Sequence, residues 1–156
     1  MFSNILVATD LSETSGRALT FAVRLARDHG AALRVLHVVH DVASEPWAIE
    51  AAGVAFAALT AEVRDRAERD LAACVARINP APERMTAEVL VGRPAAEIVR
   101  RAADLHADLV VVGSHGRGPL GRVFLGSVAD RVLRESGCPV LVVRPAAAAA
   151  AVNNAA

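Results

Sequence analysis

Residues 109–116 read Leu-Val-Val-Val-Gly-Ser-His-Gly, four apolar side chains followed at once by a glycine-containing loop. An uninterrupted apolar run of this length, ended by a turn residue, is typical of a strand that is buried on both faces. Such strands occur in parallel sheets whose two faces are covered by helices. The stretch therefore predicts a strand inside a parallel sheet, with a loop at its carboxyl end.

Further strand and helix candidates alternate along the rest of the chain, in the order β-α-β-α-β-α-β-α-β. This alternation is typical of a single doubly wound α/β domain with helices on both faces of the sheet. We assign that domain to residues 1–145 and expect the alanine-rich segment 146–156 to be a disordered tail. The other strands are predicted at 5–8, 33–39, 86–91 and 139–144, and the helices at 12–30, 51–78, 94–102 and 127–136.

The composition restricts the classes of partner that this chain can bind. Its 17 basic residues equal its 17 acidic residues, so no overall field attracts nucleic acid or an anionic membrane. Aromatic residues make up 3% of the chain, which argues against a base-stacking platform. The two cysteines lack metal-ligand spacing, and no signal peptide or membrane-spanning run is readable. We expect a cytoplasmic protein that binds neither nucleic acid nor membrane.

The loop after residue 112 combines three features that suit a phosphate group. Gly113 and Gly116 let the backbone turn tightly and approach a ligand without a Cβ in the way. Gly126 and Ser127 open the last predicted helix, whose free N–H groups and partial positive charge favour anions. Ser127 is either the N-cap of that helix or a phosphate ligand. In sheets of this class, ligands bind beyond the carboxyl ends of the strands, where the strand order reverses.

Two better-known phosphate motifs do not apply to this loop. Residues 116–121 spell G-x-G-x-x-G, but Pro119 interrupts the helix that a dinucleotide fingerprint requires. The segment also follows the fourth strand instead of the first, and no acidic residue ends a strand about 20 positions later. The chain contains no G-x-x-x-x-G-K-[ST] sequence. The glycine spacing therefore predicts a phosphate site of another class.

The longer spacing, Gly113-x2-Gly116-x9-Gly126-Ser127, resembles the nucleotide-binding signature of the universal stress protein family. The flanking stretches at 5–10, 36–38, 91–94 and 138–143 are similar to those of the same family, and the similarity extends from about residue 2 to 145. The resemblance implies a five-stranded parallel sheet in the order 3-2-1-4-5. It also implies an ATP site where the first and fourth strands lie side by side.

The resemblance assigns roles to individual residues. Asp10 would lie near the ribose or the phosphates and hold Mg²⁺ or Mn²⁺ together with phosphate oxygens. Ala8 and Thr9 would border the adenine and ribose, and the backbone of Val38 would contact adenine. Many ATP-binding members carry proline where this chain has Ala8, which we expect to alter adenine packing without abolishing binding. The loop side of the predicted site consists of Gly113, Ser114, His115, Gly116, Arg117, Gly126, Ser127 and Val128.

These features predict an ATP- or adenine nucleotide-binding protein of the stress response, with slow or no hydrolysis and with protein partners that the sequence does not name. The resemblance implies a homodimer through the last strand, Val140 to Arg144. Two alternatives stay open: an ATPase or nucleotidyl-transferring enzyme of related fold, and a nucleotide-free interaction module. No set of nucleophile, base and orienting acid is readable, so we assign no catalytic residue. His37, inside the second predicted strand, is expected to be a packed core histidine.

Overall fold

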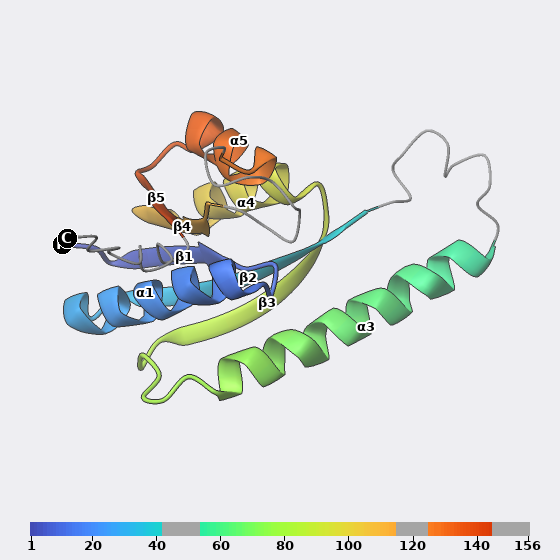
Figure 1. Ribbon diagram of the computed structural model, residues 1–156, viewed down its shortest axis with the longest axis horizontal. Coiled ribbons are helices and arrows are strands. Elements are labelled where there is room, and N and C mark those ends of the chain that lie inside the picture. The colour runs from blue at the N-terminus through green and yellow to red at the C-terminus, as the bar shows by residue number, and fades with distance from the viewer. Residues whose placement is uncertain (42–53, 115–124, 145–156) are drawn as a thin grey trace, which may run out of the picture.

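The computed structural model describes residues 1–41, 54–114 and 125–144, with side chains from residue 60 onward in the second of these ranges (Figure 1). Strands and helices alternate along these residues in the predicted order. The elements are β1 (Asn4–Ala8), α1 (Glu13–His29), β2 (Ala32–His40), α3 (Val54–Ala76), β3 (Met85–Gly92), α4 (Pro94–Asp104), β4 (Leu109–Gly113), α5 (Ser127–Glu135) and β5 (Val140–Val143).

The five strands form one parallel sheet in the order β3-β2-β1-β4-β5, which confirms the predicted fold class and strand order. β1 lies at the centre, where Ile5 pairs with Leu33 of β2 on one side and with Leu109 of β4 on the other. Since β1 and β4 both carry continuous apolar runs, each can bury side chains on both faces of the sheet.

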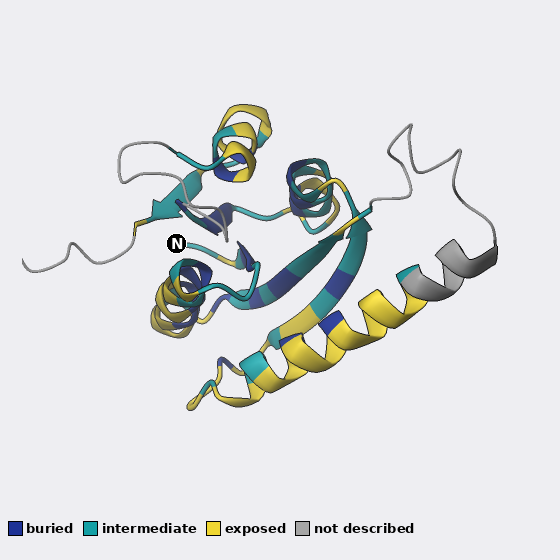
Figure 2. Cartoon of the chain, turned by 45° about the vertical axis from the view of Figure 1, so that its right-hand side comes forward, coloured by how far each residue is buried: buried dark blue, intermediate teal, exposed yellow. Residues whose placement is uncertain are grey.

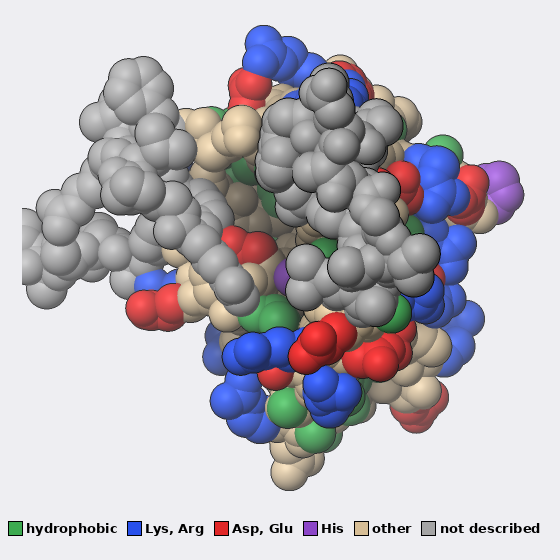
Figure 3. Space-filling view, turned by 90° about the vertical axis from the view of Figure 1, so that its right-hand side faces the viewer, with side chains coloured by type: hydrophobic (Ala, Val, Ile, Leu, Met, Phe, Trp, Pro, Cys, Tyr) green, Lys and Arg blue, Asp and Glu red, His purple; other side chains and the backbone are tan. Residues whose placement is uncertain are grey.

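Helices cover both faces of the sheet, as Figure 2 shows. Ile5 and Val7 point into a core shared with α1 and α3, whereas Leu6 and Ala8 point into a second core shared with α4 and α5. This alternation follows from the two-residue period of a strand. The carboxyl ends of β1, β2 and β3 lie toward the right of Figure 1, the side of the molecule that is turned toward the viewer in Figure 3.

The helix boundaries follow local sequence signals. The side chain of Ser12 accepts a hydrogen bond from the Ser15 N–H at the start of α1, and Gly30 ends that helix in the left-handed conformation with φ of 64°. The predicted first residues of the next helix, from position 51, lie outside the described residues. The four-residue spacing of Val63, Ala67 and Leu71 in the sequence predicts one apolar face on α3. Val63 is nevertheless 43% exposed, because the first half of α3 diverges from the sheet (Figures 1 and 2). Among the described residues, no helix is long and apolar enough to cross a membrane.

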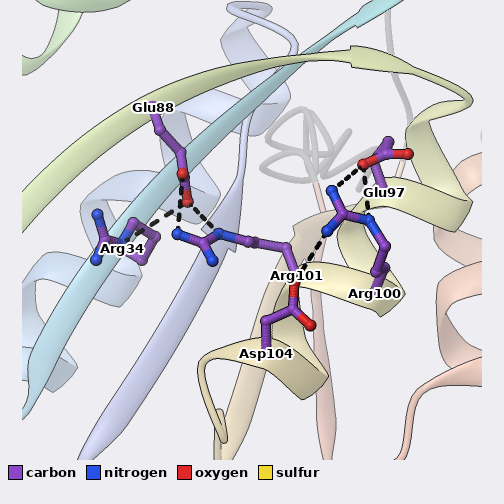
Figure 4. Close-up of polar contacts among 6 residues, drawn as sticks. All are labelled: Arg34, Glu88, Glu97, Arg100, Arg101 and Asp104. Carbon is purple, nitrogen blue, oxygen red and sulfur yellow. Dashed lines mark hydrogen bonds and ion pairs between the residues drawn. The ribbon is translucent and has the colours of Figure 1, made fainter.

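An ion-pair network joins α4 to β3 and also includes an arginine of the neighbouring strand β2 (Figure 4). Arg101 of α4 donates to both carboxylate oxygens of Glu88 on β3, at 2.7 and 3.1 Å. Arg34 of β2 lies 3.8 Å from the same carboxylate. Two-pronged pairing of a guanidinium with a carboxylate fixes direction as well as distance. The network therefore helps to orient α4, whose first turn borders the pocket described next.

Candidate functional site

A pocket of about 300 Å³ opens at the carboxyl ends of β1, β2 and β4. It lies where the strand order reverses, because the chain leaves β1 toward one face of the sheet and leaves β4 toward the other. Its described lining consists of Ala8, Thr9, Asp10, Ser15, Leu36, Val38, Pro94, Ile98, Val112, Gly113, Ser114, Gly126, Ser127, Val128 and Ala129.

Every predicted site residue that the structure describes belongs to this lining. His115, Gly116 and Arg117 lie outside the described residues. The structure thus brings the loop between β1 and α1, the middle of β2 and the start of α5 to one place, and their role in ligand binding remains a prediction. Sequence reasoning missed six lining residues, since nothing in the period of a helix or strand distinguishes a residue beside a pocket from one packed in the core. They are Ser15, Leu36, Pro94, Ile98, Val112 and Ala129.

The loop between β1 and α1 is held tightly around Thr9, which is 5% exposed. The Thr9 N–H donates to the Leu36 carbonyl at 2.9 Å, as the last backbone bond between β1 and β2. The Thr9 hydroxyl lies 3.0 Å from the Ser15 hydroxyl and accepts from the Leu11 N–H at 3.1 Å. Leu11 itself has φ of 64°, an uncommon value for a leucine. The chain therefore makes a sharp, well-anchored turn into α1.

The Asp10 carboxylate is held in the same turn. Its Oδ1 accepts from the Ser12 N–H at 3.1 Å and from the Ser12 hydroxyl at 2.6 Å. Burial by itself would raise the pKa of Asp10, but hydrogen bonds from Ser12 and Ser15 outweigh it and hold the pKa below its ordinary value. The described residues contain no group of three or more histidine, cysteine or acidic side chains able to hold a metal ion. Mg²⁺ in proteins commonly combines one carboxylate with phosphate oxygens and water, an arrangement that would suit Asp10 beside a bound phosphate.

Replacing Asp10 by asparagine should lower the free energy of unfolding at neutral pH by about 1 kcal/mol, because Ser12 would then donate to a neutral amide oxygen instead of a charged carboxylate. The folded-state pKa is depressed, so the carboxylate's contribution is complete above the unfolded-state pKa and disappears as pH falls through the folded value. Urea unfolding of both proteins at pH 7, 5 and 3 tests this. The difference should shrink below about pH 4. A difference that stays constant down to pH 3 would contradict the ionic origin of the effect.

Gly113 has a structural reason to be glycine that the sequence did not reveal. A Cβ at this position would lie 3.3 Å from the Ser15 nitrogen and 3.3 Å from the Thr14 Cγ2. The sequence interpretation, that the missing Cβ leaves room for a ligand, is therefore incomplete, because the first turn of α1 already occupies part of that space. Beyond it, the Ser114 N–H donates to the Val143 carbonyl, and the Gly126 N–H donates to the Ser114 carbonyl, both at 2.8 Å.

The start of α5 borders the other side of the pocket. Gly126 is the N-cap, with an extended backbone, and the first intrahelical bond runs from the Asp130 N–H to the Gly126 carbonyl at 2.9 Å. Ser127 is thus the first helical residue, and the alternative in which it caps its own helix is wrong. No side chain of the described residues caps α5. The N–H groups of Ser127, Val128 and Ala129 have no acceptor within the helix and give this end a partial positive charge.

His37 is not the packed core residue that the sequence predicted. Its side chain is half-buried, and its Nδ1 lies 2.7 Å from the carbonyl oxygen of Thr9. The contact arises because β2 continues past the end of β1, so the histidine ring lies beside the backbone that leaves the sheet. The prediction failed because the carbonyl that the ring contacts is 28 residues away in the sequence.

Comparison with known proteins places the whole arrangement in one group. The profile of the universal stress protein family matches residues 1–144. A universal stress protein encoded beside the QAH/OAS sulfhydrylase of Thermus aquaticus is 40% identical over 92% of this chain and 100% of its own length.

Two solved structures resemble this one. The protein MJ0577, from Methanocaldococcus jannaschii, has a TM-score of 0.80 at 28% identity, and the match covers 93% of this chain and 97% of the other. A universal stress protein solved in complex with cAMP has a TM-score of 0.59 at 27% identity, covering 91% and 96% of the two chains. The family profile, the sequence relative and the shared fold agree: this chain belongs to the universal stress protein family.

Proposed function

We propose that this protein binds an adenine nucleotide in the pocket at the ends of β1, β2 and β4, and that it acts as a regulatory protein of the stress response. The single observation that carries the proposal is the pocket itself, whose lining combines apolar side chains with the N-terminus of α5. The cAMP complex of the related universal stress protein supports an adenine nucleotide as the ligand class.

The wall of the pocket suits a purine ring. Burying a flat, poorly hydrated ring against apolar side chains is favourable, because the ring is removed from water. The apolar side chains of the lining include Ala8, Leu36, Val38, Ile98 and Val112. Pairing of β2 with β1 stops at Leu36, whereas pairing with β3 continues to His40. Val38 therefore lies beyond the end of β1, and its backbone N–H and C=O are the groups that would recognise the donor and acceptor on the edge of adenine.

The polar part of the lining suits the rest of a nucleotide. The N-terminus of α5 would bind the phosphates through the N–H groups that have no acceptor within the helix. Asp10 would accept hydrogen bonds from ribose hydroxyls or share Mg²⁺ or Mn²⁺ with the phosphates. ATP is the nucleotide that we propose, with slow or no hydrolysis. The enzyme alternative predicts turnover above about 1 per second, within the usual enzyme range.

We further propose a cytoplasmic homodimer paired through β5. Val140 to Val143 form an outer strand of the sheet, and each is only half-buried. An outer strand with apolar side chains is a template for pairing with another chain, and a second copy of β5 would cover it. Sedimentation velocity at micromolar concentration should give the mass of a dimer, and a monomer at all concentrations tested would contradict this part of the proposal.

The nucleotide itself is identified by mass spectrometry of the small molecules released from freshly purified protein, followed by calorimetric titration with ATP, AMP, cAMP and GTP. We expect adenine nucleotides to bind at least about tenfold more tightly than GTP. No released nucleotide, together with no heat of binding at millimolar ATP, would overturn the proposal. Rapid release of phosphate from ATP would favour the enzyme alternative instead.

Val128→Trp should weaken nucleotide binding by at least about tenfold, because the larger side chain would extend into the pocket beside the helix end. Leu133→Trp is a matched control on the same helix. Both positions are exposed, at 37% and 49%, so neither change should disturb the core, but only Val128 lines the pocket. Calorimetric titration of the two variants and the wild type checks this. Equal affinities for all three proteins would mean that the ligand binds elsewhere.

A further inference from the structure

We propose that His37 is a positioning residue for this pocket: its ring holds the Thr9 carbonyl and so fixes where Asp10 meets a ligand. The proposal rests on nucleotide binding as the proposed function and adds a residue that does not itself touch the ligand. The described lining of the pocket includes its neighbours Leu36 and Val38 but not His37. Successive side chains of a strand point to opposite faces, so His37 lies on the α1 side of the sheet.

The ring takes the place of a backbone partner. The ladder between β1 and β2 ends with Ala8 beside Leu36, and the Thr9 N–H still bonds the Leu36 carbonyl. Beyond this point the chain turns away, and Nδ1 of His37 lies 2.7 Å from the Thr9 carbonyl oxygen. A carbonyl oxygen only accepts, so Nδ1 must carry the hydrogen. The side chain thus supplies the donor that a further residue of the ladder would otherwise provide.

Fixing this carbonyl fixes the peptide plane that joins Thr9 to Asp10, since the amide is planar. The other polar atoms of Thr9 are also engaged, the N–H by Leu36 and the hydroxyl by Ser15 and Leu11. Asp10 is held from the far side by Ser12. The contact from His37 therefore completes a rigid support for a carboxylate at the mouth of the pocket, and rigid support of a binding group improves affinity by reducing the entropy lost on binding.

A packing role alone would not explain a histidine here. The side chain is only half-buried, and a leucine would fill the same space without a polar ring to satisfy. The test therefore compares His37→Leu, which keeps size but removes the donor, with His37→Asn, whose amide nitrogen can occupy the place of Nδ1. Calorimetric titration with ATP should show about a five- to tenfold loss for His37→Leu, the effect of about one hydrogen bond. His37→Asn should remain within about threefold of the wild type.

A double-variant cycle separates positioning from a general loss of stability. If His37 acts through Asp10, then His37→Leu should weaken ATP binding much less in an Asp10→Asn background than in the wild type. Three outcomes would each overturn the inference. The losses of ATP affinity caused by His37→Leu and Asp10→Asn could simply add in the double variant. Alternatively, His37→Asn could bind ATP as weakly as His37→Leu, or His37→Leu could bind ATP like the wild type. Circular dichroism and urea unfolding establish that each variant is folded.

Failure of the proposed function would be visible separately, as a wild-type protein that binds no nucleotide. In that case the contact between the His37 ring and the Thr9 carbonyl is tested without a ligand, by amide hydrogen exchange at Leu11 and Ser12. Exchange there should accelerate in His37→Leu and stay close to wild type in His37→Asn. Unchanged exchange in His37→Leu would show that the ring does not hold the turn and would also overturn the inference.

Discussion

Leu6→Ala is expected to lower the free energy of unfolding by about 2 to 5 kcal/mol. Leu6 lies on the central strand and is 0% exposed, in the core between the sheet and the helices α4 and α5. Removing three carbon atoms there loses their transfer free energy and leaves a cavity that close-packed neighbours can fill only in part. Urea unfolding followed by circular dichroism measures the change.

Leu133→Ala is the matched control, because the same atoms are removed from a side chain that is 49% exposed on α5. Its effect should stay within about 0.5 kcal/mol, as for most surface changes. If the two variants lose similar amounts of unfolding free energy, Leu6 is not packed more tightly than the exposed Leu133, which would contradict the burial of the central strand.

Gly113→Val is expected to destabilise the protein by about 1 to 3 kcal/mol, the usual cost of inserting atoms into a well-packed region. The first added carbon would already meet the Ser15 nitrogen and the Thr14 Cγ2 at 3.3 Å, and one of these atoms is backbone that cannot rotate away. The branched side chain should therefore push the end of β4 away from the first turn of α1. Since Ser15 and Gly113 both line the pocket, we also expect at least about a tenfold weaker affinity for ATP under the proposed function.

Gly137→Val provides the comparison for this change. A Cβ at Gly137 meets nothing within 4 Å, so the same substitution should have little effect on stability and none on the pocket. Urea unfolding and calorimetric titration of the two variants distinguish the cases. If Gly113→Val is as stable as the wild type but no longer binds ATP, the glycine serves only the ligand, and the packing argument is wrong.

The order of strands and helices could be predicted from the sequence because each element is marked by residues close to one another in the chain. Apolar runs at 5–8 and 109–112 predict strands buried on both faces, and Gly30 and Pro94 mark a helix end and a helix start. The strand order came from the family resemblance, and the structure confirms it. Val63 shows the limit of this reasoning, since helical periodicity gives the direction of a side chain but not how far the sheet extends beneath it.

The described residues that the sequence analysis proposed for the site lie around one pocket, because the carboxyl ends of parallel strands lie at one edge of a sheet, and their binding of a ligand stays a prediction. The reasons for individual residues were predicted less well. Ser127 was considered as a cap, but the chain enters α5 one residue earlier, with Gly126 as the N-cap. His37 was assigned to the core, although its ring reaches a backbone carbonyl on the neighbouring strand.

Periodicity and turn residues thus specify the order of the elements and place the glycine loop at the end of a buried strand, because both depend on neighbours a few positions away. The contacts that shape the pocket join distant segments: Gly113 meets Ser15, and His37 meets Thr9. Such pairs require β4 and β2 to lie on either side of β1. The structural roles of Gly113 and His37 therefore depend on the tertiary structure, because their partners come within contact distance only when the sheet is formed.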